Sequence, residues 1–291
     1  MSTRLRAIAK QTDRINESGW YTAPSGRVVK IGEQIATAVR GTRVHGPDPV
    51  DPEPVAPDPV HPEPMEVPET ARTATAFEVT PEGSLAAAGR MLDEDRAGVA
   101  VLNFASARNP GGGFLNGAQA QEEYLCRNSA LHACLRGQRE FYEAHRADPS
   151  PFYSDRVIHS PAVPVFRGED NTLLEEPLTV GFLTSAAPNA GVIVRRDPAA
   201  AARVPEALAV RAERVLEVAV LGGYRRLVLG AWGCGVFQNR PEHVAGAFAA
   251  LLGPGGRFAG RFSRVVFAVL DRRADSPTRE AFVRAFPPDG R

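Results

Sequence analysis

From about residue 73 to the C-terminus, apolar segments of strand length alternate with amphipathic segments of helical length. This alternation constrains the fold more than any other feature of the chain. Residues 98–105 (GVAVLNFA) and 225–233 (RRLVLGAWG) are apolar almost throughout, which is typical of strands that are buried on both faces of a sheet. We therefore predict an α/β sandwich, in which helices cover both faces of a mixed, largely parallel sheet.

The individual elements follow from length and periodicity, and no internal repeat is visible. The expected strands are residues 75–80, 98–105, 156–167, 177–186, 225–233 and 263–271. The expected helices are residues 84–95, 121–137, 205–223, 241–253 and 278–286.

The first 70 residues lack this alternation of strands and helices and have a different composition. A helix over 4–17, a hairpin over 19–32 and a helix over 33–39 are expected there. Residues 46–69 then contain nine prolines among acids and valines, a composition that disrupts helix and sheet and favours an extended chain. The predicted organisation is a helical N-terminal extension (1–45), a linker rich in proline and acid (46–70) and an α/β domain (71–291).

The overall composition excludes several classes of protein. With 34 basic and 34 acidic residues, the chain has no net charge to attract nucleic acid or a membrane surface. Cys126, Cys134 and Cys234 form no CxxC pair, so we expect neither a disulfide framework nor a metal site. No signal peptide or membrane-spanning segment is expected, and the protein is predicted to be cytoplasmic.

Two glycine-rich loops follow predicted strands, at the sheet edge where α/β folds bind ligands. In the first, the glycines at 111–113 permit positive φ and let backbone N–H groups face a phosphate or sugar, although a plain surface turn is the alternative. In the second, Gly233 and Gly235 suit a diphosphate. Phe237 is expected to pack on a ribose or base, or else to fill the core, and Cys234 to be a small buried side chain. GxGxxG is absent after the first strand, which disfavours a Rossmann dinucleotide fold.

Between these loops, Gln121, Glu122 and Glu123 occupy the first turn of a predicted helix. One acid there is explained by the helix dipole. Two adjacent acids repel each other, and this repulsion should raise the pKa of at least one of them, especially if the loop partly buries them. A glutamic acid that stays protonated near neutral pH can donate a proton to a glycosidic oxygen.

The GGG run at 111–113 followed by QEE at 121–123 resembles the signature of poly(ADP-ribose) glycohydrolases, of the compact bacterial type. The segments NFASARNPGGG, TSAAPN and GAWGCGVFQN add to the resemblance, which runs from about residue 5 to the C-terminus and omits the proline-rich stretch. It implies a macrodomain-like fold with a helical N-terminal extension. It also implies hydrolysis of ribosyl–ribose O-glycosidic bonds, with release of ADP-ribose and without a metal or cofactor.

The resemblance assigns a role to each matching residue. Glu123 corresponds to the proton donor and activator of water, Glu122 to the acid that binds the ribose hydroxyls, and Gln121 to a residue that orients the pair. The catalytic loop beside the distal ribose corresponds to Gly111, Gly112 and Gly113. The diphosphate-binding loop corresponds to Gly233, Cys234, Gly235, Val236 and Phe237, with Phe237 against the distal ribose. Asn103, at the end of its strand, corresponds to a polar residue near the ligand.

Two other functions stay open at this point. A macrodomain that binds ADP-ribose without cleaving it is one, although carboxylates beside a dianionic diphosphate would weaken binding. A hydrolase of mono-ADP-ribosyl or O-acetyl-ADP-ribose esters is the other. The expected partners are poly(ADP-ribose), ADP-ribose and the ADP-ribosylated proteins that carry the polymer, in a bacterial DNA-damage response. We expect a monomer that binds neither membranes nor specific nucleic-acid sequences.

Overall fold

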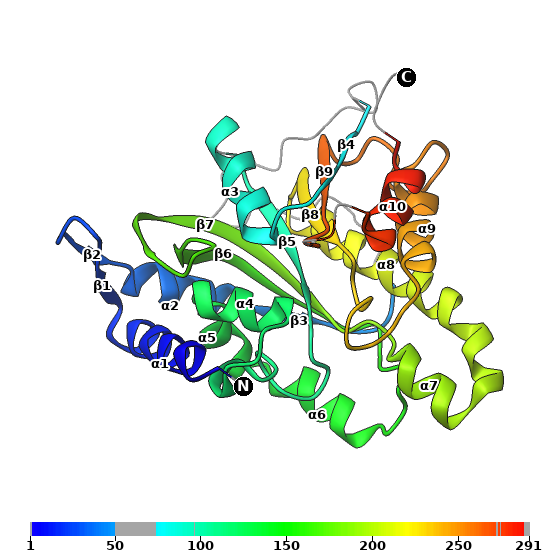
Figure 1. Ribbon diagram of the computed structural model, residues 1–291, viewed down its shortest axis with the longest axis horizontal. Coiled ribbons are helices and arrows are strands. Elements are labelled where there is room, and N and C mark those ends of the chain that lie inside the picture. The colour runs from blue at the N-terminus through cyan, green and yellow to red at the C-terminus, as the bar shows by residue number, and fades with distance from the viewer. Residues whose placement is uncertain (1, 50–73, 96, 272, 274, 288–291) are drawn as a thin grey trace.

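A seven-stranded sheet with the strand order β3-β6-β7-β5-β8-β9-β4 forms the centre of the computed structural model (Figure 1). The structure describes residues 2–49, 74–95, 97–271, 273 and 275–287. The strands of the sheet are β3 (Arg43–His45), β4 (Ala76–Thr80), β5 (Val99–Phe104), β6 (Val157–Arg167), β7 (Leu173–Ser185), β8 (Arg226–Gly230) and β9 (Arg264–Ala268). β6 pairs antiparallel with β3 and β7, and every other neighbouring pair is parallel. The predicted mixed, largely parallel sheet is confirmed.

Helices cover both faces of this sheet, as the sequence predicts. They are α1 (Thr3–Ser18), α2 (Gly32–Gly41), α3 (Ser84–Glu94), α4 (Gln121–Asn128), α5 (Leu131–Arg136), α6 (Arg139–Ala147), α7 (Ala190–Arg196), α8 (Val204–Leu221), α9 (Pro241–Leu252) and α10 (Pro277–Ala285). Two short 3₁₀ helices, η2 (Phe114–Asn116) and η3 (Pro198–Arg203), and a separate hairpin of β1 (Trp20–Thr22) and β2 (Val28–Lys30) complete the elements of the described residues.

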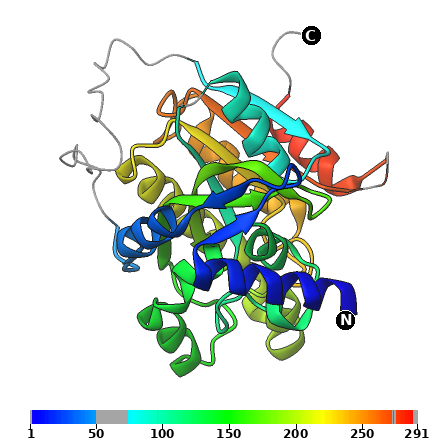
Figure 2. The same ribbon diagram turned by 90° about the vertical axis from the view of Figure 1, so that its left-hand side faces the viewer.

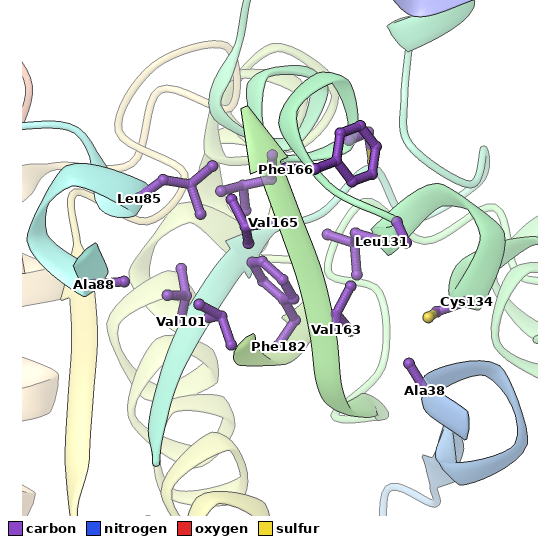
Figure 3. Close-up of a cluster of buried hydrophobic side chains, with 14 of the residues drawn as sticks. Ala38, Leu85, Ala88, Val101, Leu131, Cys134, Val163, Val165, Phe166 and Phe182 are labelled. Atoms are coloured by element: carbon purple, nitrogen blue, oxygen red, sulfur yellow. The ribbon is translucent and has the colours of Figure 1, made fainter. Parts of the chain in front are cut away.

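The central strand β5 shows why two helical layers are needed. Val99 and Val101 point into one core, and Ala100 and Leu102 point into the other. Successive side chains of a strand alternate between the faces of a sheet, so an apolar run needs cover on both sides. Figure 3 shows the first core, where side chains of α2, α3 and α5 meet those of β5, β6 and β7. α8, α9 and α10 enclose the second.

One helix differs from the prediction. The single helix expected over 121–137 is two helices, α4 and α5, because Ser129 has extended backbone angles and forms an antiparallel bridge with Val165 of β6. Its hydroxyl donates to the Leu125 carbonyl at 2.7 Å and accepts from the Leu131 N–H at 3.2 Å. A serine that satisfies backbone groups in this way competes with the helix. Strand β3 and helices α6 and α7 were not predicted.

The N-terminal residues form the expected helices and hairpin, and β3 adds an edge strand to the main sheet. Helix α1, dark blue in Figure 2, packs on η2 and α4. The Thr12 hydroxyl donates to the Arg127 carbonyl of α4 at 2.7 Å, and Arg167 Nε donates to the Thr12 hydroxyl at 3.3 Å. Residues 50–70 of the expected linker lie outside the described residues.

Candidate active site

Three loops meet at the carboxyl ends of the neighbouring parallel strands β7, β5 and β8. They are the post-β7 loop (186–189) and two loops that are named after the roles expected from the resemblance, the catalytic loop (105–120) and the diphosphate loop (231–240). Trp232 Nε1 donates to the Ser185 carbonyl at 3.0 Å, and Asn239 Nδ2 donates to the Pro188 carbonyl at 2.8 Å. These bonds tie the post-β7 and diphosphate loops together. The two glycine-rich loops predicted to share a site are thus on adjacent strands.

Gln121 fixes the start of α4 against the end of β5. Its Oε1 accepts from the Phe104 N–H at 2.9 Å, and its Nε2 donates to the Leu102 carbonyl at 2.8 Å and the Ser84 hydroxyl at 3.2 Å. The Gln121 amide thus satisfies two backbone groups at the end of β5 that would otherwise pair with a neighbouring strand. Gln121 therefore sets where the first turn of α4, and the two acids on it, lie relative to the sheet.

The Glu122 carboxyl is 3% exposed and is held by the residues that follow β5. Its Oε2 accepts from the Ser106 N–H at 2.7 Å, and its Oε1 accepts from Asn103 Nδ2 at 3.4 Å. Asn103 Nδ2 also donates to the Thr184 hydroxyl at 3.1 Å. Burial and, to a smaller extent, the nearby Glu123 charge raise the pKa of Glu122 to about 8, although the Ser106 N–H opposes the rise.

The prediction that one of the two acids has a raised pKa is confirmed for Glu122. Both expected causes contribute, and the loss of solvation on burial is larger than the repulsion between the two carboxylates. At neutral pH, Glu122 is therefore mostly protonated.

The Glu123 carboxyl is 8% exposed and has one oxygen bound and one free. Oε1 accepts from the Gly113 N–H at 2.8 Å. Oε2 is buried and has no hydrogen-bond partner among the described residues. The acids of α4 thus bind the residues before them and not the N–H groups of their own helix, so helix capping does not account for the pair.

The glycines of the catalytic loop permit close contact with both acids. Gly111 and Gly112 have φ of 68° and 57°. A Cβ on Gly112 would lie 2.5 Å from Glu123 Oε1 and 3.0 Å from Glu122 Oε2. The expectation that these N–H groups face a ligand is wrong. The Gly113 N–H binds Glu123, the Gly112 N–H binds the Asn109 carbonyl, and the Gly111 N–H is directed at Glu122.

The diphosphate loop does have backbone N–H groups without a partner. Among the described residues, the N–H groups of Gly235, Val236 and Phe237 donate no hydrogen bond. Gly235 and Val236 are exposed, and Val236 is 79% exposed. Gly233 (φ 72°) closes the loop, and its carbonyl accepts from Asn239 Nδ2 at 3.1 Å. Successive free N–H groups of this kind attract an anion.

Two of the predicted site residues of this loop, Cys234 and Phe237, have partly buried side chains. The Phe237 ring packs at the edge of the second core, 5.8 Å from the ring of Tyr153. Burial raises the pKa of Cys234 to about 12, so its thiol stays protonated, as expected of a small buried side chain.

Several supporting residues had been given no role from the sequence. Ser106 and Thr184 lie in segments that carry the resemblance; the Ser106 N–H donates to Glu122, and the Thr184 hydroxyl accepts from Asn103, which also donates to Glu122. Arg211 of α8 is 2% exposed, and it donates to the Ala186 carbonyl at 2.7 Å and to Asp155 at 2.9 Å. An arginine on an amphipathic helix usually faces solvent, so no local signal marked this one.

The described residues contain no group of three or more His, Cys, Asp or Glu side chains that could hold a metal ion. Across the same part of the chain, no helix has both the length and the apolar character needed to cross a membrane.

Comparison with known proteins places this geometry in context. Residues 9–168 match the family model described as "Microbial-type PARG, catalytic domain". No curated protein sequence matches the chain.

Two groups of solved structures are similar to it over most of their length. Poly(ADP-ribose) glycohydrolase from Thermomonospora curvata, bound to the inhibitor ADP-HPD, is 49% identical with a TM-score of 0.86, and the match covers 98% of this chain and 100% of that one. The enzyme from Deinococcus radiodurans, in complex with ADP-ribose, is 42% identical with a TM-score of 0.74, over 87% of this chain and 97% of that one. The macrodomain-like fold is confirmed by these matches.

Proposed function

Because the chain belongs to the family of microbial-type poly(ADP-ribose) glycohydrolases, we propose that it is a glycosidase that hydrolyses the ribosyl–ribose O-glycosidic bonds of poly(ADP-ribose) and releases ADP-ribose. One observation carries the catalytic assignment. Glu123 Oε2 is a buried carboxyl oxygen without a partner among the described residues, on a side chain whose other oxygen is fixed by Gly113. A carboxyl group held in this way is available to transfer a proton.

Bond cleavage is the first step of the proposed reaction. The bond between the anomeric carbon and the leaving oxygen breaks, its electron pair goes to the oxygen, and Glu123 gives that oxygen a proton. Glu123 takes this proton back from water in the second step, while Glu122, which is mostly protonated at neutral pH, keeps its own proton. Glu122 hydrogen-bonds the ribose hydroxyls and so orients the sugar.

Water completes the reaction in the second step. As a water molecule attacks the oxocarbenium-like anomeric carbon, Glu123 accepts its proton and is ready for the next cycle. The Gly113 N–H holds Oε1 throughout, so the same oxygen, Oε2, serves both steps. A carboxylate that alternates between acid and base in this way needs no second nucleophilic carboxylate.

The diphosphate loop anchors the rest of the ADP-ribose unit. The free N–H groups of Gly235, Val236 and Phe237 bind the diphosphate, and the Phe237 ring lies against the distal ribose. Asn103, held between Glu122 and Thr184, completes the polar lining near the sugar.

We also propose that the enzyme acts as a cytoplasmic monomer on ADP-ribosylated carrier proteins, in a bacterial DNA-damage response. The three site loops come from a single chain, which supports a monomeric enzyme. The division into an extension (1–45), a linker (46–70) and a catalytic domain (71–291) stays a prediction.

Incubation of the purified protein with poly(ADP-ribose), followed by chromatography, tests the proposal. We expect free ADP-ribose to accumulate. Binding of the polymer without cleavage would indicate an ADP-ribose-binding module instead. Cleavage of O-acetyl-ADP-ribose or of mono-ADP-ribosyl protein, with no release from the polymer, would indicate an esterase-like hydrolase.

A further inference from the structure

Tyr153 has a backbone conformation that its side chain disfavours. Its φ is 60°, in the left-handed region that glycine adopts readily and a bulky residue rarely does. Such a residue is retained where the surrounding structure fixes it, and such positions cluster at functional sites. Tyr153 lies between α6 and β6, outside the segments that resemble the family signature.

Hydrogen bonds on both sides of Tyr153 hold this turn in place. The Ser154 N–H donates to His145 Nε2 at 3.1 Å, and the Ser154 hydroxyl lies 2.8 Å from the same nitrogen. The Asn189 N–H donates to the Pro151 carbonyl at 2.8 Å. The left-handed conformation is therefore imposed by its neighbours on a residue that would otherwise avoid it.

The consequence of this conformation is where the ring lies. The Tyr153 side chain packs against a small cluster that Ala105 and Ala107 of the catalytic loop form with Ala186 of the post-β7 loop. Its ring centroid is 5.8 Å from that of Phe237 in the diphosphate loop, with 43° between the planes. One half-buried side chain thus packs against a cluster drawn from two of the site loops and lies beside Phe237 of the third.

His145 supports the ring from the other side. The two rings meet edge to face, with centroids 5.8 Å apart and an interplanar angle of 86°. The His145 side chain is 2% exposed and packs edge to face on Phe141 as well. Tyr153 is held between this rigid support and the more exposed Phe237.

We propose that Tyr153 is a positioning residue for glycosidic hydrolysis, whose ring fixes Phe237 against the ribose that carries the bond to be cleaved. The inference rests on the proposed function. The strained backbone at Tyr153 then has a functional explanation, because this turn conformation places the ring beside the site loops. Loss of the ring would let Phe237 move, and a misaligned ribose reacts more slowly even when it still binds.

A residue needed only for the turn would behave in the opposite way. Glycine suits a φ of 60° better than tyrosine, so Tyr153→Gly relieves the backbone while it removes the ring. Tyr153→Phe keeps the ring and removes only the hydroxyl. Tyr153→Asn is a second ringless variant that tolerates the left-handed region. Ala162→Gly, at a φ of 48° in β6, is the matched control for relief of backbone strain away from the site.

The test measures kcat and KM on poly(ADP-ribose), together with the melting temperature, for these variants and the wild type. We expect Tyr153→Gly and Tyr153→Asn to lower kcat by about 10- to 100-fold with KM changed less than about threefold. Tyr153→Phe and Ala162→Gly should keep the wild-type kcat. In a protein that already carries Phe237→Ala, Tyr153→Gly should lower kcat by less than about a further twofold, because both substitutions remove the same contact with the ribose.

Two results would overturn the inference while the proposed function stands. One is a wild-type kcat in both ringless variants. The other is a full, multiplicative loss when Tyr153→Gly is combined with Phe237→Ala, which would show that the ring does not act through Phe237. Failure of the wild type to cleave the polymer would overturn the proposed function itself, and the inference with it.

Discussion

The buried Glu122 carboxyl should make the stability of the protein depend on pH, and Glu122→Gln should remove that dependence. The pKa of Glu122 rises from an ordinary value of 4.5 to about 8 in the folded protein. Between these values the folded state holds a proton that the unfolded state has released. The free energy of unfolding therefore falls as the pH rises through this window. Glutamine resembles the protonated acid and does not titrate.

The size of the effect follows from the shift. Each pH unit inside the window changes the free energy of unfolding by up to about 1.4 kcal/mol, so the wild type should lose about 3 kcal/mol relative to the variant between about pH 5 and pH 8. Buried His145 has the opposite sign, because burial lowers its pKa to about 4 and the folded state then binds fewer protons than the unfolded state. The difference between the two proteins cancels this contribution, which both share.

Urea denaturation at several pH values measures the difference directly. Glu143→Gln, which removes an exposed carboxylate of α6, is the control and should follow the wild type. A difference between Glu122→Gln and the wild type that stays constant with pH would refute the buried, protonated state of Glu122. A difference in the free energy of unfolding that grows as the pH falls would refute it as well.

Three further changes test the loops and the N-terminal helix. Gly112→Ala should lower kcat at least about tenfold and destabilise the protein by about 1–2 kcal/mol, because the new Cβ would displace the Glu123 carboxyl. Gly26→Ala is the control, since Gly26 also has a positive φ but has open space around it. This control should lose stability and keep the wild-type kcat. Gly235→Val should weaken ADP-ribose binding at least about tenfold by calorimetry, because the side chain would obstruct the N–H groups of the diphosphate loop. The melting temperature should stay unchanged, since no described atom lies within 4 Å of a Cβ at this position. Gly137→Val, at an equally open position, is the matched control and should bind as the wild type does. Arg167→Leu should cost about 2–3 kcal/mol in urea denaturation, because the buried guanidinium binds Gln11 and Thr12 of α1.

Much of the fold was accessible from the sequence because it depends on periodicity. The apolar run of β5 specifies burial on both faces, and the pairing of β5 with β8 as parallel neighbours places the two glycine-rich loops together. Strand β3 has only three residues and no pattern of its own, so its pairing with β6 could not be predicted. The break at Ser129 depends on Val165, which is distant in the chain.

The site was predicted less completely, for a similar reason. Residue types and spacing single out Glu122, Glu123 and the glycines, but they do not show which N–H groups are already bound. The Gly113 N–H faces a carboxylate of its own chain, whereas the Gly235 N–H is open. Tyr153 lies in an irregular segment, and its contact with Phe237 depends on tertiary structure alone.

Turnover by Glu123→Gln tests the central claim most directly. The amide keeps the shape of the side chain but cannot transfer a proton, so kcat on poly(ADP-ribose) should fall by about a hundred- to ten-thousandfold. The Kd for ADP-ribose, titrated by calorimetry on the same preparation, should stay within about tenfold of the wild-type value, because the diphosphate loop is unchanged. A kcat near that of the wild type, with ADP-ribose still bound, would contradict the assignment of Glu123 as the proton donor.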